Sequence, residues 1–151
     1  MTNKASRQPL EHPRILLVED DPGDVLITRE SLEASRAGCE IDVVDDGAMA
    51  LDFLHKRRGY EDAPTPHLVL LDLNLPKVSG HQVLAELKAD PDLAPIPVVV
   101  LSTSTADDDV HATYALHGNA HVAKPVDLER YQDAVRAIDE FFLGVAEAPL
   151  A

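Results

Sequence analysis

Short, mostly apolar runs recur along the chain and end abruptly at polar residues. These runs are Arg14–Val18, Ile41–Val44, Leu68–Leu71, Val98–Leu101 and Ala120–Ala123. Apolar runs of this length without strict alternation are typical of strands that are covered on both faces, as in a parallel sheet. The pattern therefore predicts five buried strands.

Between these runs the apolar residues recur about every 3.6 positions, which is typical of amphipathic helices. The helices are expected from Pro22 to Gly38, from Gly47 to Arg58, from about His81 to Asp90, from Asp107 to Gly118 and from Leu128 to Phe142. Strands that alternate with helices predict an α/β fold, a doubly wound five-stranded parallel sheet with five helices. The flavodoxin-like strand order 2-1-3-4-5 is the common solution for five such units.

The length of the chain fits one domain. Its 151 residues are enough for one well-formed core, with little left for a second. Residues 1–13 are polar without periodicity and are expected to form a flexible lead-in. The domain itself is expected over residues 14–143, followed by a C-terminal extension over 144–151.

Composition narrows the range of partners. The net charge of −14 disfavours direct binding to nucleic acid, whose phosphates are bound by clustered Lys and Arg. No apolar run approaches the roughly 20 residues of a membrane span, and the polar N-terminus lacks the apolar core of a signal peptide. The single cysteine, Cys39, cannot form an internal disulfide, which suits a reducing cytoplasm. We therefore expect a cytoplasmic protein.

Polar residues follow four of the five predicted strands. Glu19–Asp21 come after the first strand, Asp72 after the third, Ser102 after the fourth and Lys124 after the fifth. In the order 2-1-3-4-5 the carboxyl ends of these strands adjoin, where open α/β sheets place their ligands. Several neighbouring carboxylates need a compensating cation, and Mg²⁺ prefers carboxylate and carbonyl oxygens. With Mg²⁺ and Lys124, the crevice suits phosphoryl transfer, with Asp72 as the nucleophile.

Four motifs that carry these residues resemble one family. They are Ile15–Asp21, Leu70–Pro76 with Gly80, Val100–Thr103 and Lys124-Pro125. In this order and at strand ends, they resemble the response-regulator receiver domains of two-component signalling. The resemblance runs from about Arg14 to the C-terminus and implies the CheY-like form of the flavodoxin-like fold.

The resemblance implies a role for each acidic residue. Asp72 would be the phosphoacceptor, and Asp20 the main acidic Mg²⁺ ligand, with Glu19 beside it acting directly or through water. The backbone carbonyl of Asn74 would be the third protein ligand. Asp21 would supply the metal oxygen instead if the end of the first strand lies one residue later.

The resemblance also implies a switch. Ser102 would be the hydroxyl that moves toward the phosphoryl group, Lys124 would contact that group, and Pro125 would follow a cis peptide bond. The position three before Lys124 is usually Tyr or Phe in receivers, but here it is His121. Because imidazole is titratable, we expect the active-state balance to depend on pH between about 5.5 and 7.5. The alternative is an exposed histidine without a special role.

A narrower resemblance is to the stand-alone regulators paired with bacterial phytochrome histidine kinases. It rests on Tyr60–Pro66, Asp72–Pro76, Ile96–Ser104, Phe141–Leu143 and Pro149-Leu150. It implies a sensor histidine kinase, a bacteriophytochrome, as the partner, and dimerisation through the C-terminal extension. Phe141, Phe142, Leu143 and Val145 would place apolar surface all round a helix end, which favours a homodimer. The alternative is a terminal helix that folds onto its own domain.

Other functions fit the residues less well. Phosphatases with an Asp nucleophile have a second acid two residues later as the general acid, but here that position is Asn74. A flavodoxin-type cofactor site needs a phosphate-binding loop where this chain has three acids. A phosphorelay intermediate or a scaffold receiver without an output domain stays open as an alternative. Because no DNA-binding domain fits after Phe142, output is expected through protein contacts or onward phosphotransfer.

Overall fold

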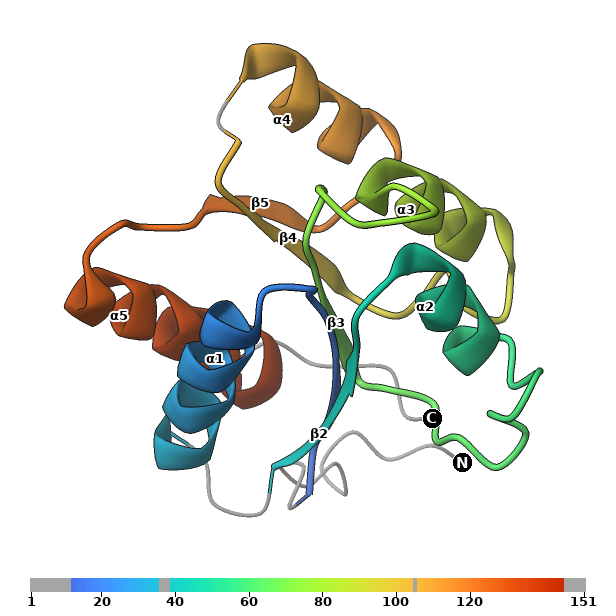
Figure 1. Ribbon diagram of the computed structural model, residues 1–151, viewed down its shortest axis with the longest axis horizontal. Coiled ribbons are helices and arrows are strands. Elements are labelled where there is room, and N and C mark those ends of the chain that lie inside the picture. The colour runs from blue at the N-terminus through green and yellow to red at the C-terminus, as the bar shows by residue number, and fades with distance from the viewer. Residues whose placement is uncertain (1–11, 36–38, 105, 146–151) are drawn as a thin grey trace.

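The fold alternates strands and helices along the chain (Figure 1). The computed structural model describes residues 12–35, 39–104 and 106–145. The strands are β1 Arg14–Val18, β2 Glu40–Val44, β3 Leu68–Leu71, β4 Val98–Ser102 and β5 Ala120–Ala123. The helices are α1 Pro22–Ser35, α2 Gly47–Leu54, α3 Gly80–Ala89, α4 Asp107–Ala115 and α5 Leu128–Asp139, and a π-helical segment η2, Glu140–Val145, follows α5.

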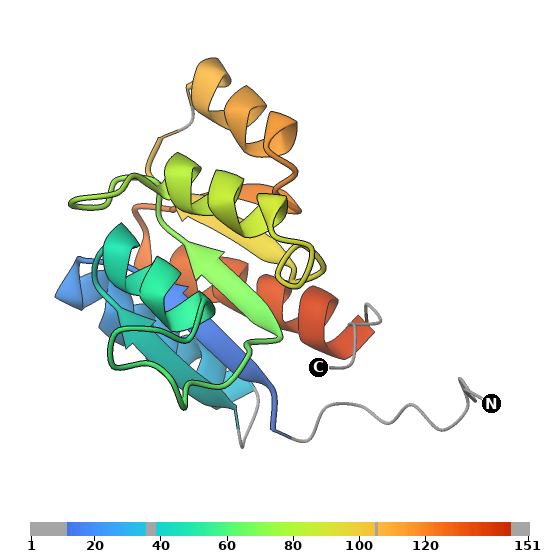
Figure 2. The ribbon, with the colours of Figure 1, turned by 90° about the vertical axis from the view of Figure 1, so that its right-hand side faces the viewer.

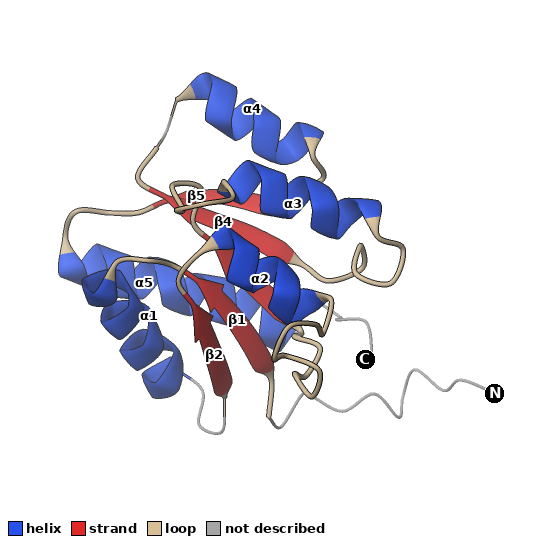
Figure 3. Cartoon of the chain, turned by 45° about the vertical axis from the view of Figure 1, so that its right-hand side comes forward, coloured by secondary structure: helices blue, strands red, loops and turns tan. Residues whose placement is uncertain are grey.

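All five strands join one parallel sheet in the order β2-β1-β3-β4-β5, which confirms the predicted fold. Helices cover both faces (Figure 3), with α2 and α3 on one side and α1 and α5 on the other. The register pairs Val18 of β1 with Leu71 of β3, and Leu71 with Val100 of β4. The carboxyl ends of these central strands therefore lie side by side at the same edge of the sheet.

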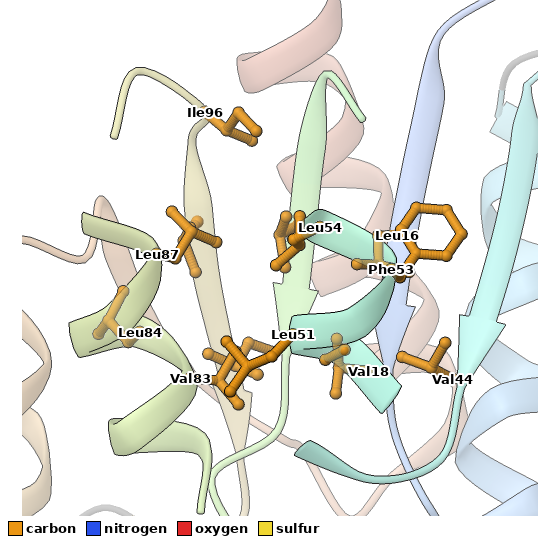
Figure 4. Close-up of a cluster of buried hydrophobic side chains, with 14 of the residues drawn as sticks. Leu16, Val18, Val44, Leu51, Phe53, Leu54, Val83, Leu84, Leu87 and Ile96 are labelled. Carbon is orange, nitrogen blue, oxygen red and sulfur yellow. The ribbon is translucent and has the colours of Figure 1, made fainter. Parts of the chain in front are cut away.

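The sheet separates two apolar cores. On one face, side chains of α2 and α3 point onto the central strands (Figure 4), as Leu51 and Leu84 do. On the other face, α5 contributes Tyr131, Val135 and Ile138 beneath the strands. In the view of Figure 2, α2 and α3 lie in front of the sheet and α5 lies behind it. Because β3 and β4 are buried on both faces, their apolar runs are continuous, as parallel strands require.

Three helix ends differ from the prediction, and one of them is that of α4, which ends at Ala115 and not at Gly118. The helix expected to reach Arg58 ends at Leu54, because the following turn takes Lys56 and Arg58 into the left-handed region, with φ of 54° and 52°. The last helix was expected to continue to Phe142, but α5 ends at Asp139 and the chain continues as η2. Periodicity in sequence does not distinguish these changes of backbone winding from a continuing α-helix.

The C-terminal aromatic cluster is only partly exposed. Phe141 is 55% exposed, and its ring lies edge-on against Phe142 with centroids 5.0 Å apart. Phe142 packs partly against the domain's own core, and Leu143 is buried in it. Part of the apolar surface expected to face a second copy is therefore covered by the domain itself.

Some of the expected features lie outside the described residues. The lead-in is described only at residues 12 and 13, and the C-terminal extension only at 144 and 145. Within the described part of the chain, none of the helices has the length and apolar content needed to cross a bilayer.

Candidate functional site

Backbone pairing at the ends of β1 and β3 brings two acidic residues together. The Asp72 N–H donates to the Val18 carbonyl at 3.0 Å, and the Glu19 N–H donates to the Val44 carbonyl at 3.0 Å. The backbone pairing of β1 therefore ends at Glu19, and that of β3 ends at Asp72. Glu19 and Asp72 are nevertheless buried, with exposures of 3% and 7%.

Three carboxylates form one group at this edge. Glu19, Asp20 and Asp72 each place an oxygen within 4.8 Å of the others, and Asp20 is the exposed member. Asp21 does not belong to this group, because its side chain accepts a hydrogen bond from the Gly23 N–H at 2.9 Å at the start of α1. Of the two alternatives for the metal oxygen, this geometry favours Asp20 over Asp21.

The fifth strand adds a cation. The Lys124 N–H donates to the Ser102 carbonyl at 2.8 Å, directly beyond the last β4–β5 pair. The Lys124 side chain is 5% exposed, and its Nζ lies 2.5 Å from Glu19 Oε2 and 3.7 Å from Asp72 Oδ2. Residues from three of the four predicted strand ends, those of β1, β3 and β5, therefore lie together.

Burial and charge act in opposite directions on this ion pair. Burial raises the pKa of Glu19 to about 7, although the nearby Lys124 ammonium acts to lower it. Burial acts to lower the pKa of Lys124, but the carboxylates around it outweigh that effect and raise the pKa above its ordinary value. The nearby ammonium therefore does not offset the effect of burial on the pKa of Glu19.

The backbone after Asp72 folds back tightly. The Gly80 N–H donates to the Leu73 carbonyl at 3.0 Å, and a Cβ on Gly80 would lie 2.3 Å from the Asp72 carbonyl oxygen. A residue with a side chain at position 80 would therefore push on the backbone of Asp72. The Asn74 N–H lies 3.4 Å from Asp72 Oδ1. That the Asn74 carbonyl is a metal ligand stays a prediction.

The hydroxyl of Ser102 already has a partner. Ser102 is fully buried, and its Oγ accepts a hydrogen bond from the Ser104 N–H at 3.1 Å. This bond links the end of β4 to the first residues of the β4–α4 loop. Movement of the Ser102 hydroxyl toward a group on Asp72 would therefore disturb Ser104.

His121 joins that loop to α4. Its Nε2 lies 3.0 Å from the Ser104 carbonyl oxygen, and its Nδ1 lies 2.9 Å from Thr113 Oγ1. The Thr113 hydroxyl donates to the Asp109 carbonyl at 3.0 Å, and the Ser104 hydroxyl donates to the Asp109 carboxylate. The Tyr114 hydroxyl accepts from the His121 N–H at 3.1 Å. His121 is thus part of a hydrogen-bonded network and not an exposed histidine without contacts.

One expectation at the site is wrong. The described part of the chain contains no cis peptide bond, so the bond before Pro125 is trans. The bond from the Lys124 N–H to the Ser102 carbonyl continues the β5 pairing by one residue. This pairing directs the Lys124 side chain into the site without a change of peptide geometry.

Asp24 is a further residue at this site that the sequence did not indicate. Its Oδ2 accepts a hydrogen bond from Lys124 Nζ at 2.9 Å, across 100 positions of sequence. A carboxylate in the first turn of a helix is commonly explained by the helix dipole. The local sequence therefore contained no signal for this long-range contact.

The donor set suits a hard divalent cation. Three carboxylates within 4.8 Å of one another, two of them buried, provide the oxygen ligands that Mg²⁺ and Mn²⁺ prefer. A cation there would offset the mutual repulsion of the three carboxylates.

Comparisons with known proteins agree with this geometry. Residues 15–136 match the model of the response regulator receiver domain family. The response regulator Rcp1 of Synechocystis is 45% identical over 137 residues, which is 91% of this chain and 93% of that protein.

Two solved structures are similar along most of the chain. The phosphorylated cyanobacterial phytochrome response regulator RcpA has a TM-score of 0.90 and 44% identity, over 92% of this chain and 99% of that one. The Mn²⁺-bound form of Rcp1 has a TM-score of 0.88 and 44% identity, over 91% of this chain and 99% of that one.

Proposed function

The chain belongs to the response regulator receiver domain family, whose function is to accept a phosphoryl group, and we propose that Asp72 is the acceptor. The observation that carries this assignment is the position of Asp72 at the end of β3, beside two further carboxylates and 3.7 Å from the Lys124 ammonium. A carboxylate so placed has both a cation to balance the incoming charge and a site for metal.

In the proposed reaction, a carboxylate oxygen of Asp72 forms a bond to phosphorus while the bond from phosphorus to a kinase histidine nitrogen breaks. The electron pair of the broken bond leaves on the imidazole, and an acyl phosphate remains on Asp72. Lys124 balances the charge on the transferred group, and the Ser102 hydroxyl donates a hydrogen bond to one of the phosphoryl oxygens. The protein catalyses only its own phosphorylation and dephosphorylation and has no separate substrate.

The cation is proposed to be Mg²⁺. Glu19, Asp20 and Asp72, with the Asn74 carbonyl, are the residues that would hold it. When bound, it supplies positive charge to the oxygens of the transferring group. Support comes from the three carboxylates and from the similarity to Rcp1, which has a Mn²⁺-bound form.

The phosphoryl donor is proposed to be a sensor histidine kinase of the bacteriophytochrome class, in the cytoplasm. Support comes from the similarity to RcpA, a phytochrome response regulator. Output is proposed to run through protein contacts of the surface formed by α4, β5 and α5. A phosphorelay intermediate, which passes the group on to another histidine, is the second candidate.

Acetyl phosphate with Mg²⁺ tests the assignment of Asp72. We expect intact-mass spectrometry to find one added phosphate that is stable to acid and labile to base. Asp72→Asn should abolish it, because an amide does not form the acyl phosphate. Asp21→Asn is the control, since it removes a nearby charge outside the carboxylate group. Phosphate on Asp72→Asn, or none on the parent, would contradict the proposal.

The protein is further proposed to be a C₂ homodimer through its C-terminal segment, with residues 144–151 as an extension of the receiver domain. Support comes from Phe141, which is 55% exposed on η2, because an exposed aromatic side chain is commonly buried at an interface. Sedimentation should give a dimer for the parent and a monomer for Phe141→Ser. Tyr114→Ser, which alters an exposed aromatic residue on α4, is the control. A monomeric parent would refute the dimer.

A further inference from the structure

The ammonium of Lys124 is shared among three carboxylates. Its Nζ lies 2.5 Å from Glu19 Oε2, 2.9 Å from Asp24 Oδ2 and 3.7 Å from Asp72 Oδ2. An ammonium has three donors, but the distance to Asp72 exceeds a hydrogen bond. In this arrangement the Lys124 ammonium is hydrogen-bonded to Glu19 and Asp24, and its interaction with Asp72 is only electrostatic.

Asp24 is well placed to bind the Lys124 ammonium. It lies in the first turn of α1, where the helix dipole stabilises a negative charge, and its side chain is 24% exposed. The helix that carries it is anchored to α5, because Thr28 Oγ1 and the Tyr131 hydroxyl are hydrogen-bonded at 3.1 Å. Asp24 is also separate from the group of Glu19, Asp20 and Asp72. Its carboxylate is therefore not one of the oxygens proposed to hold the metal ion.

We propose that Asp24 is a positioning residue that holds the Lys124 ammonium away from Asp72 before phosphorylation. The inference rests on the proposed function, because it assigns Asp72 as the acceptor. A carboxylate hydrogen-bonded to an ammonium is a weaker nucleophile than one that faces it at a distance, since the lone pair is engaged. With Asp24 in place, Asp72 keeps its attacking oxygen free, and Lys124 remains near enough to meet the phosphoryl group after transfer.

A positioning role for Asp24 and a simple charge effect change the phosphorylation rate in opposite directions when Asp24 is replaced. Acetyl phosphate is an anion, so the removal of any nearby negative charge should favour its approach and raise the phosphorylation rate. If Asp24 positions Lys124, its removal lets the ammonium bond to Asp72, and the rate falls. The two explanations therefore predict opposite changes for the same variant.

The experiment measures the rate of Asp72 phosphorylation by acetyl phosphate at saturating Mg²⁺ for the parent, Asp24→Asn, Asp24→Glu and Asp21→Asn. We expect Asp24→Asn to be about three- to tenfold slower, the effect of one modest hydrogen bond. Asp24→Glu, which keeps a carboxylate in the first turn of α1, should retain most of the parent's phosphorylation rate. Asp21→Asn, which removes a charge from the same loop and keeps the oxygen that accepts from Gly23, should match or exceed the parent.

A second measurement does not depend on turnover. The buried Lys124 ammonium should give a resolved ¹⁵N signal by NMR in the parent, and Asp24→Asn should shift it or lose it to exchange with water. Asp21→Asn should leave that signal in place, and the backbone amide spectrum reports whether each variant is folded.

The outcomes separate the two hypotheses. An Asp24→Asn variant that is as fast as the parent or faster, or whose ammonium signal is unchanged, overturns the positioning role. A parent that takes up no phosphate on Asp72 overturns the proposed function itself.

Discussion

The centre of the sheet and its β5 edge are packed very differently. All residues of β3 and β4 are buried, whereas those of β5 are partly buried or exposed. The helices above them differ in the same way: α3 buries Gly80, Val83, Leu84 and Leu87, but within α4 only Thr113 is buried. Figure 1 shows α4 at the margin of the molecule, beyond α3.

This difference matches the division of chemistry between the two regions. Asp72 and Glu19 lie on the well-packed strands, where a precise arrangement of charges is held by a large apolar core. His121 and Ser104 lie at the loosely packed edge, where few apolar contacts oppose a local movement. Ser102 connects the two, because it ends β4 and accepts a hydrogen bond from the Ser104 N–H. A well-packed site coupled to a loosely packed surface suits a phosphorylation switch.

The largest expected effect is a difference in stability between a variant of the apolar core under α3 and a variant on α4. Leu84→Ala on α3 removes a fully buried side chain and should lower the free energy of unfolding by about 3 kcal/mol. Tyr114→Ala on α4 removes a side chain that is 51% exposed and should cost at most about 1 kcal/mol. Urea denaturation measures both values. Equal losses would show that α4 is as firmly packed as α3.

An intermediate effect concerns His121. The Ser104 carbonyl can only accept a hydrogen bond, and the Thr113 hydroxyl already donates to the Asp109 carbonyl. The two ring nitrogens of His121 therefore connect the β4–α4 loop to α4. The pH dependence expected from the sequence stays a prediction, and its structural basis would be the loss of one of these two bonds, which should loosen the loop and favour the active state.

His121→Phe tests this idea, since phenylalanine keeps a flat ring but cannot form either bond. We expect a loss of about 1–2 kcal/mol in stability at pH 6 and a flat pH profile for the active state. NMR of the β4–α4 loop, with beryllium fluoride as the phosphoryl mimic, measures that profile. Identical profiles for the variant and the parent would eliminate the pH dependence.

The smallest expected effect lies at the amino ends of β1 and β3, opposite the carboxylate group. His67 Nδ1 accepts a hydrogen bond from the Arg14 N–H at 3.0 Å, and burial, with the charge of Arg14, lowers the pKa of His67. A histidine with a lowered pKa stabilises the fold above its unfolded value near 6.5, and this contribution is lost as the pH falls through the folded value. The bond contributes about 1 kcal/mol.

Stability measured from pH 7.5 to pH 5 should therefore fall more in the parent than in His67→Asn, whose side-chain oxygen accepts the bond without titrating. A parent whose stability is independent of pH in this range would show that His67 does not contribute.

The strand ends could be predicted from the sequence because each apolar run stops at a charged or polar residue. The helix ends could be predicted less well. Nothing in the periodicity indicated that α2 stops at Leu54 or that η2 follows Asp139, because these changes depend on how the loops return to the sheet. The expected cis bond before Pro125 came from family resemblance alone, and the described chain does not contain it.

By itself, the sequence determined which polar residues stand at the ends of four strands: the acids after β1 and β3, the hydroxyl at the end of β4 and the lysine after β5. Burial of apolar runs is a local property of the chain, so the elements and their polar ends follow from pattern. Only the tertiary structure decided which charges meet, including the contact of Lys124 with Asp24 and the network around His121. Such contacts depend on distances between residues far apart in the chain, and local preference does not encode them.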